Sequence, residues 1–126
     1  MKLNPDCVRD LLIDVEENTS FNKYYICSND EPTPLINKYT YDVILYHARY
    51  CYEAKLLNGF QPYDSGKYFI IADLSPDGHS FLSNIRSDTN WNKVKDAGKK
   101  VGSFSLDFLK EVAANVVSAA IKHQFS

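Results

Sequence analysis

The amino-acid sequence predicts a single α+β domain that is mostly helical and contains one small β-hairpin. Its composition, 44% hydrophobic and 24% charged over 126 residues, is typical of a globular chain long enough to bury its own core. Apolar residues recur at helical spacing in several segments. One stretch, residues 57–74, instead combines high strand propensity with a turn-rich centre. We therefore expect helices packed around one hairpin.

The first helix is predicted after Asn4, whose side chain can cap free N–H groups at a helix start. Pro5 and Asp6 suit the first turn, since proline needs no donor there and a carboxylate favours the positive end of the helix dipole. Apolar residues then follow at i, i+3, i+4 and i+7: Val8, Leu11, Leu12 and Val15. This helix should end near Asn18.

The segment 19–39 is predicted to be irregular, with a short strand at residues 24–26 and a second at residues 35–36. A longer helix should then run from Thr40 to about Leu57. Its apolar centre consists of Ile44, Ala48 and Cys51. Its opposite face is mixed in character and carries Asp42, Leu45, Tyr46, Arg49 and Glu53.

The predicted hairpin has strands at residues 57–60 and 68–74, joined by a loop over 61–67. Both faces of the second strand are largely apolar, so we expect each to be covered. Ser75 then begins another helix by the same cap and proline pattern. Gly78 lies in that helix at a cost of about 1 kcal/mol, which we interpret as a close approach of the hairpin.

Two further helices are predicted in the C-terminal part. A short one is anchored by Trp91, and Ser105 caps the last one. The last helix has an apolar arc wider than a surface helix normally shows. We therefore divide the chain into a domain over residues 1–100 and a C-terminal helix over residues 101–126.

Several functional classes are disfavoured by what the sequence lacks. The net charge of -2 argues against a strongly cationic nucleic-acid binder. We find no phosphate-binding loop, nucleophile elbow or desolvated carboxylate pair, so we expect no catalytic residues and no cofactor. His47 and Cys51 have a spacing that could hold a metal, but a buried core pair is the better interpretation and we expect no metal. No run of apolar residues is long enough for a membrane span.

One junction resembles a known pattern. Residues 74–82, Leu-Ser-Pro-Asp-Gly-His-Ser-Phe-Leu, resemble the L-[ST]-x-x-G-x-x-[FL]-L run that follows the wing of many bacterial winged-helix proteins. With residues 1–10, 84–91 and 102–106, the whole chain resembles the phage and prophage domain-of-unknown-function 2513 family. This resemblance implies a winged-helix-like domain with an appended C-terminal helix, in the cytoplasm of a bacterial host or a phage-infected cell. It implies no activity.

The resemblance and the residues lead to two functional hypotheses. The first is a non-catalytic regulator that contacts duplex DNA, because winged helices place the helix before the wing in the major groove. The residues that could contact DNA are Lys38, Arg49 and Lys67. Asp42 and Glu53 on the same surface would repel phosphates.

The alternative is an oligomeric adaptor or inhibitor that binds a host protein. Aliphatic and aromatic side chains on the exposed helix face would anchor such a partner. The candidates are Leu45, Tyr46 and Tyr50. Self-association would use the C-terminal helix, whose candidate contacts are Phe108, Val112, Val116 and Ala120.

Overall fold

The computed structural model describes residues 1–102 and 104–125, with side chains described as far as residue 122. These residues form an α+β fold in which helices pack against a three-stranded antiparallel sheet. The elements are α1 (Pro5–Glu17), β1 (Tyr25–Ser28), α2 (Pro34–Tyr39), α3 (Tyr41–Glu53), β2 (Leu57–Tyr63), the short 3-10 turn η1 (Asp64–Gly66), β3 (Tyr68–Leu74), α4 (Pro76–Ile85), α5 (Asp88–Val101) and α6 (Leu106–Phe125).

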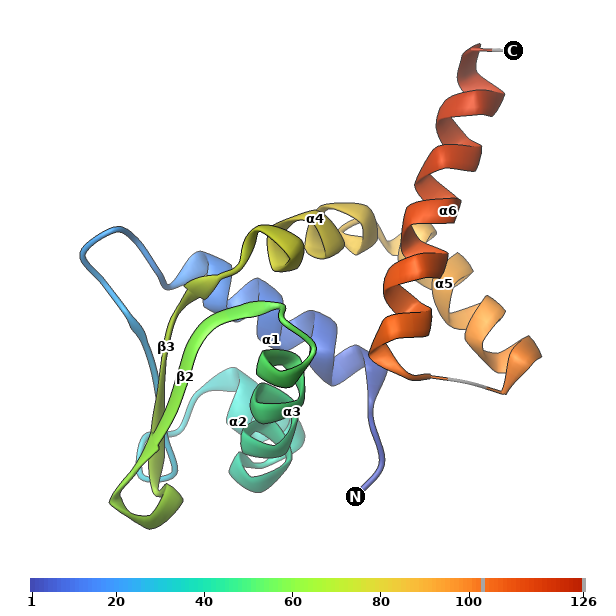
Figure 1. Ribbon diagram of the computed structural model, residues 1–126. Helices are drawn as coiled ribbons and strands as arrows, with labels where there is room; N and C mark the ends of the chain where they lie inside the picture. The colour runs from blue at the N-terminus through green and yellow to red at the C-terminus, as the bar shows by residue number, and fades with distance from the viewer. Residues whose placement is uncertain (103, 126) are drawn as a thin grey trace.

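The strands lie in the order β1-β3-β2, so the last strand in sequence is central. The hairpin β2–η1–β3, which we call the wing, follows α3 directly, and this order makes the fold winged-helix-like. Figure 1 shows α1, α2 and α3 gathered on one side of the sheet, while the end of α6 projects beyond the other elements. Phe69 and Ile71 of β3 are fully buried beneath these helices.

The hairpin is better formed than the sequence predicted. Its strands extend to Tyr63 and Tyr68, whose rings stack with centroids 5.3 Å apart across the strands. The predicted loop over 61–67 therefore shrinks to the turn at η1. The sheet also gains β1, which pairs with the free side of β3.

Two predictions about the middle of the chain are wrong. Residues 35–36 are not a strand but part of α2, because Pro34 begins a helix and the Thr33 hydroxyl accepts the Ile36 N–H at 3.2 Å. The helix predicted to reach Leu57 ends at Glu53. Lys55 there adopts a positive φ of 66°, which turns the chain into β2.

Other departures are smaller. The predicted short helix around Trp91 is the 14-residue α5, capped by the Ser87 hydroxyl, which accepts the Asn90 N–H. We expected both faces of β3 to be covered. The face with Tyr68, Ile70 and Ala72 is only partly covered, and Ile26 of the neighbouring β1 is 61% exposed on it.

The junction between α2 and α3 is strained at Thr40. This β-branched residue has φ 72° and ψ 153°, a region that is essentially reserved for glycine and costs about 1–3 kcal/mol. Thr40→Gly should therefore raise the free energy of unfolding by about 1 kcal/mol, after the extra entropy of glycine in the unfolded chain is subtracted. Thermal unfolding would measure it. Thr40→Ala keeps a Cβ and should not gain stability. Equal thermal midpoints for Thr40→Gly and Thr40→Ala would therefore contradict the strain at this position.

Candidate functional site

The exposed side of α3 and the adjacent wing enclose a groove, which we call the α3–β2 groove. Its volume is about 570 Å³. It is lined by Met1, Asp42, Leu45, Tyr46, Arg49, Phe60, Pro62 and Gly66. Aliphatic and aromatic side chains dominate this lining, so the groove offers an apolar floor at the surface of the protein.

The groove exists because the two faces of α3 differ. Ile44, Ala48 and Cys51 are fully buried in the core, whereas Leu45 at its margin is partly buried and Arg49 is exposed. This is the apolar centre predicted for the helix.

The wing forms the second wall of the groove. The Tyr41 hydroxyl donates to the Gly66 carbonyl at 2.7 Å and ties the turn of the wing to the start of α3. Phe60 pairs in register with Ile71, and its ring centroid lies 5.5 Å from that of Phe69.

His47 anchors α3 to the N-terminal segment. Its Nδ1 lies 2.7 Å from the Val43 carbonyl, and its Nε2 accepts the Asn4 N–H at 2.8 Å. Since a backbone N–H can only donate, Nε2 must be unprotonated and the ring is the neutral Nδ1–H tautomer. Both ring nitrogens are thus occupied within the protein.

The predicted pair His47 and Cys51 is a core pair in this arrangement. Both side chains are fully buried. Burial raises the pKa of the Cys51 thiol, so it is protonated and a poor metal ligand at neutral pH. Within residues 1–102 and the described part of α6, no group of three or more metal-ligating side chains is arranged to hold an ion.

The charges around the groove do not favour phosphate. Arg49 Nε lies 3.7 Å from Glu53 Oε1, and Asp42 is exposed at the groove wall. Asp64 lies at the turn of the wing beside the exposed Lys67. The surface that a winged helix would present to DNA therefore carries three carboxylates against two cations among these residues.

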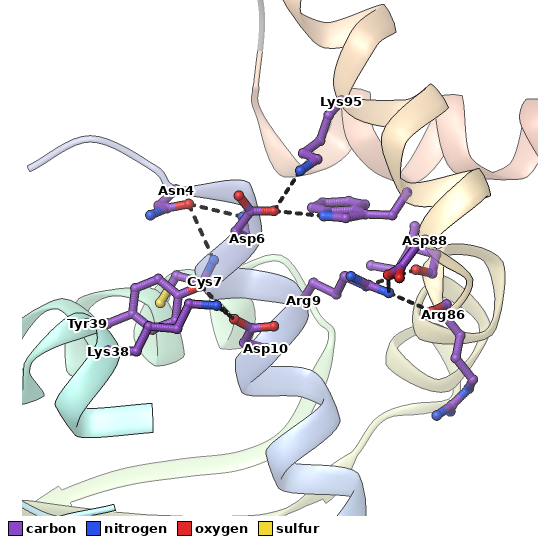
Figure 2. Close-up of polar contacts among 12 residues, drawn as sticks. Asn4, Asp6, Cys7, Arg9, Asp10, Lys38, Tyr39, Arg86, Asp88 and Lys95 are labelled. Carbon is purple, nitrogen blue, oxygen red and sulfur yellow. Dashed lines mark hydrogen bonds and ion pairs between the residues drawn. The ribbon is translucent and has the colours of Figure 1, made fainter. Parts of the chain in front are cut away.

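Lys38, the third predicted DNA contact, points elsewhere. Figure 2 shows its amine beside Asp10 of α1, and Lys38 Nζ donates to Asp10 Oδ2 at 2.9 Å. The same carboxylate accepts the Tyr39 hydroxyl at 2.6 Å. The hydrogen bond to Asp10 raises the pKa of Lys38. The structure thus uses Lys38 to hold α2 against α1.

The predicted protein-contacting residues do lie together. Leu45 and Tyr46 line the groove, and the Tyr50 ring centroid is 5.9 Å from that of Tyr46. Phe60 was missed, because its place opposite Leu45 depends on how the wing folds back along α3. Its one signal in the sequence was an aromatic residue in a predicted strand.

The candidate self-association residues divide along α6. Val112 and Val116 are partly buried and pack against the core, beside the fully buried Leu109. Phe108 is half-buried, whereas Ala120 is exposed. The first turns of α6 therefore pack on its own domain, and association through the outer turns stays a prediction.

A polar network joins α5 to the start of α1, as Figure 2 shows. Trp91 Nε1 and Lys95 Nζ both donate to Asp6 Oδ1, at 2.8 and 3.1 Å. Arg9 donates to the Ile85 carbonyl and pairs with Asp88 at 2.9 Å. Lys95 of α5 is thereby engaged in holding α5 against the start of α1.

Asp6 should make stability depend on acid pH. Partial burial raises the pKa of Asp6, but hydrogen bonds from Trp91 and Lys95 and the charge of Lys95 lower it more, so the pKa lies below its usual 3.8. A lowered pKa in the folded state contributes stability above the unfolded pKa, and this is lost as pH falls below about 4. The advantage of the native protein over Asp6→Asn in urea unfolding should shrink between about pH 5 and pH 3. A difference in unfolding free energy between the two proteins that stays constant over this pH range would contradict the prediction.

A family model described as "Hypothetical protein (DUF2513)" matches residues 2–105. The chain belongs to the DUF2513 family. The match spans α1 to α5 and ends just before α6.

A curated relative in Haemophilus influenzae is 28% identical over 120 residues, which cover 94% of this chain and 97% of the relative. It is described as an uncharacterized protein. No solved structure matches this DUF2513 chain. None of the helices over the described residues is long and apolar enough to cross a membrane.

Proposed function

We propose that this DUF2513 protein is a non-catalytic protein-binding module whose α3–β2 groove receives apolar side chains of a partner. The observation that carries the proposal is the lining of the groove, where Leu45, Tyr46 and Phe60 meet at the surface. Burying one leucine-sized or aromatic partner side chain there contributes about 2 kcal/mol, and tyrosine is a frequent anchor of interfaces. The partner is thus a protein with an exposed apolar anchor, as an adaptor or inhibitor would require.

Electrostatics support protein over DNA as the occupant. Binding to duplex DNA depends on several cations that neutralise phosphates. Around this groove Arg49 is near Glu53, and Asp42 and Asp64 add negative charge. A protein interface tolerates this mixture, because rim charges select a partner without supplying most of its affinity.

Contact with DNA is the second candidate, favoured by one observation. The chain has the winged-helix order, and Arg49 on α3 and Lys67 beside the turn of the wing are both exposed. A DNA-binding protein should retard duplex DNA at low salt and lose affinity steeply at moderate salt. Arg49→Ala and Lys67→Ala should each weaken that retardation. The absence of retardation at low salt would remove this candidate.

The protein-binding proposal is tested at Tyr46. Tyr46→Ala removes an anchor from the groove and should weaken binding by about 2 kcal/mol or more, about thirtyfold in Kd. The measurement uses the tagged chain as bait and then calorimetry with the purified protein that it retains.

The matched control is Tyr63→Ala, which removes a 43% exposed tyrosine from β2 that does not line the groove. It should bind as the native protein does. Equal affinities for the native protein and Tyr46→Ala, with both folded by circular dichroism, would refute the groove as the binding site.

A further inference from the structure

The strand β1 lies at the opposite edge of the sheet from the α3–β2 groove. It pairs with β3 through one side, and within the described residues no strand pairs with its other side. In Figure 1 the segment that leads from α1 into β1 stands clear of the helices. An edge strand of this kind presents backbone groups that another strand can bind.

Hydrogen bonding identifies the free groups. The Asn29 N–H donates to the Lys67 carbonyl, which fixes the alternation in this antiparallel pair. Along such a strand, every second residue directs its backbone N–H and carbonyl toward the partner strand, and the residues between direct theirs away. Tyr25 and Cys27 lie four and two residues before Asn29 and therefore face β3. Ile26 lies between them and directs its N–H and carbonyl outward. The Ser28 carbonyl is not available to another strand, because it accepts the Glu31 N–H at 3.2 Å. The open part of the edge is thus centred on Ile26.

Two hollows lie along this edge. One, of about 370 Å³, extends from β1 to the end of α1 and the start of α2, where Asp14, Asn18 and Pro34 line it. The other, of about 540 Å³, is lined by Phe21, Asn22, Lys23, Tyr24 and Ile26. Successive side chains of a strand point to opposite faces, so a strand added here would place alternate residues in the two hollows.

Three large apolar side chains are exposed along the second hollow, beside the polar Asn22 and Lys23. Phe21 is 98% exposed, at the tip of a tight turn in which Ser20 and Lys23 exchange backbone hydrogen bonds. Tyr24 and Ile26 are 59% and 61% exposed beside it. A contiguous exposed group of this kind typically marks a contact surface.

We propose that the free edge of β1 binds an extended segment of another protein as an added strand. The Ile26 N–H and carbonyl hold its backbone, and apolar residues at alternate positions cover Phe21, Tyr24 and Ile26. This is strand addition, in which main-chain bonds give affinity and the flanking hollows give specificity.

A second copy of this chain fits the edge less well than a foreign segment. Pairing of β1 with β1 would bring Tyr25 and Cys27 of the other copy to the helix side. These side chains are 6% and 4% exposed because they lie in their own core, so they cannot fill the hollow beside Asp14. A segment with free side chains on both faces can fill both hollows.

The test selects random heptapeptides displayed on phage against the full chain and then measures the synthetic peptides by fluorescence anisotropy. Peptides with apolar residues at alternate positions should bind, and Ile26→Lys should weaken them at least about tenfold by placing a charge on the open face. Tyr63→Lys, on the far strand of the same sheet, should bind as the native chain does. Methylating the peptide nitrogen that faces Ile26 should also cost about tenfold, since it removes a main-chain donor.

Amide hydrogen exchange gives a readout that does not depend on a variant. Bound peptide should slow exchange at the Ile26 N–H. Peptides that bind Ile26→Lys as tightly as the native chain, or that protect Leu45 and Phe60 in place of Ile26, would overturn the proposal. So would a dimer in sedimentation that Ile26→Lys converts to a monomer, because a second copy would then occupy the edge. Tyr46→Ala should leave peptide binding unchanged, which keeps this result separate from the α3–β2 groove.

Discussion

Gly78→Ala is expected to destabilise the protein by about 3 kcal/mol or more, although it adds a single methyl group. A Cβ at this position would lie 2.0 Å from the Leu56 carbonyl oxygen and 3.0 Å from its carbon. Both are backbone atoms, so the clash cannot be relieved by a side-chain rotation.

The surroundings of Gly78 also resist movement. The Leu56 carbonyl accepts the Ser75 N–H at 3.0 Å. The Ser75 hydroxyl donates to the Lys55 carbonyl at 2.6 Å and accepts the Gly78 N–H at 2.9 Å. Separating α4 from residues 55–56 would therefore break the cap of the helix along with its packing.

Urea unfolding of Gly78→Ala against the native chain measures this effect. Ser80→Ala is the matched control, because Ser80 is an exposed residue of the same helix and the substitution creates no clash. Its unfolding free energy should stay within about 0.5 kcal/mol of the native value. A Gly78→Ala variant as stable as the control would show that α4 and the start of the wing do not approach this closely.

Gly78 also shows what the sequence could predict. A glycine inside a capped helix is costly without a reason, and the sequence suggested a close approach of the hairpin. The structure shows a close approach to Leu56, the residue directly before the hairpin. The caps at Asn4 and Ser75 are confirmed too, since each accepts a backbone N–H of its own first turn. Local chemistry within one turn was enough for these predictions.

One failure is local, at residues 35–36, and the other features that were missed involve residues distant in sequence. Leu35 is apolar in a short segment, and periodicity over two residues cannot separate a strand from a buried helix turn. The ion pair of Lys38 with Asp10, which lies 28 positions earlier, was likewise not predicted. The groove needs Phe60 beside Leu45, which depends on the direction of the wing. Such placements follow from tertiary packing, which one sequence does not encode in its local pattern.

The two proposed contacts lie at opposite edges of one sheet. The α3–β2 groove adjoins the last strand in the order β1-β3-β2, and the free edge belongs to the first. A protein with both could hold two partners at once, because neither set of lining residues includes a member of the other. This arrangement is consistent with an adaptor more than with an inhibitor of a single target.

Trp91→Ala should cost about 3–5 kcal/mol, the range for removing a buried tryptophan. Trp91 is 2% exposed in α5, and Arg9 and Lys95 lie 5.9 and 5.6 Å from its ring centroid. Its Nε1 also donates to Asp6, so the substitution removes both packing and a hydrogen bond that joins α5 to α1.

The cooperativity of unfolding in Trp91→Ala is as informative as the loss of stability. Because Trp91 connects α5 to the first helix, Trp91→Ala should lower the midpoint of one cooperative transition seen by both circular dichroism and tyrosine fluorescence. Trp91→Phe keeps most of the ring and loses the bond to Asp6, so it should cost less, about 1–2 kcal/mol. Native protein in which α5 and α6 melt separately before the sheet would contradict this, since the network at Asp6 would then not couple them.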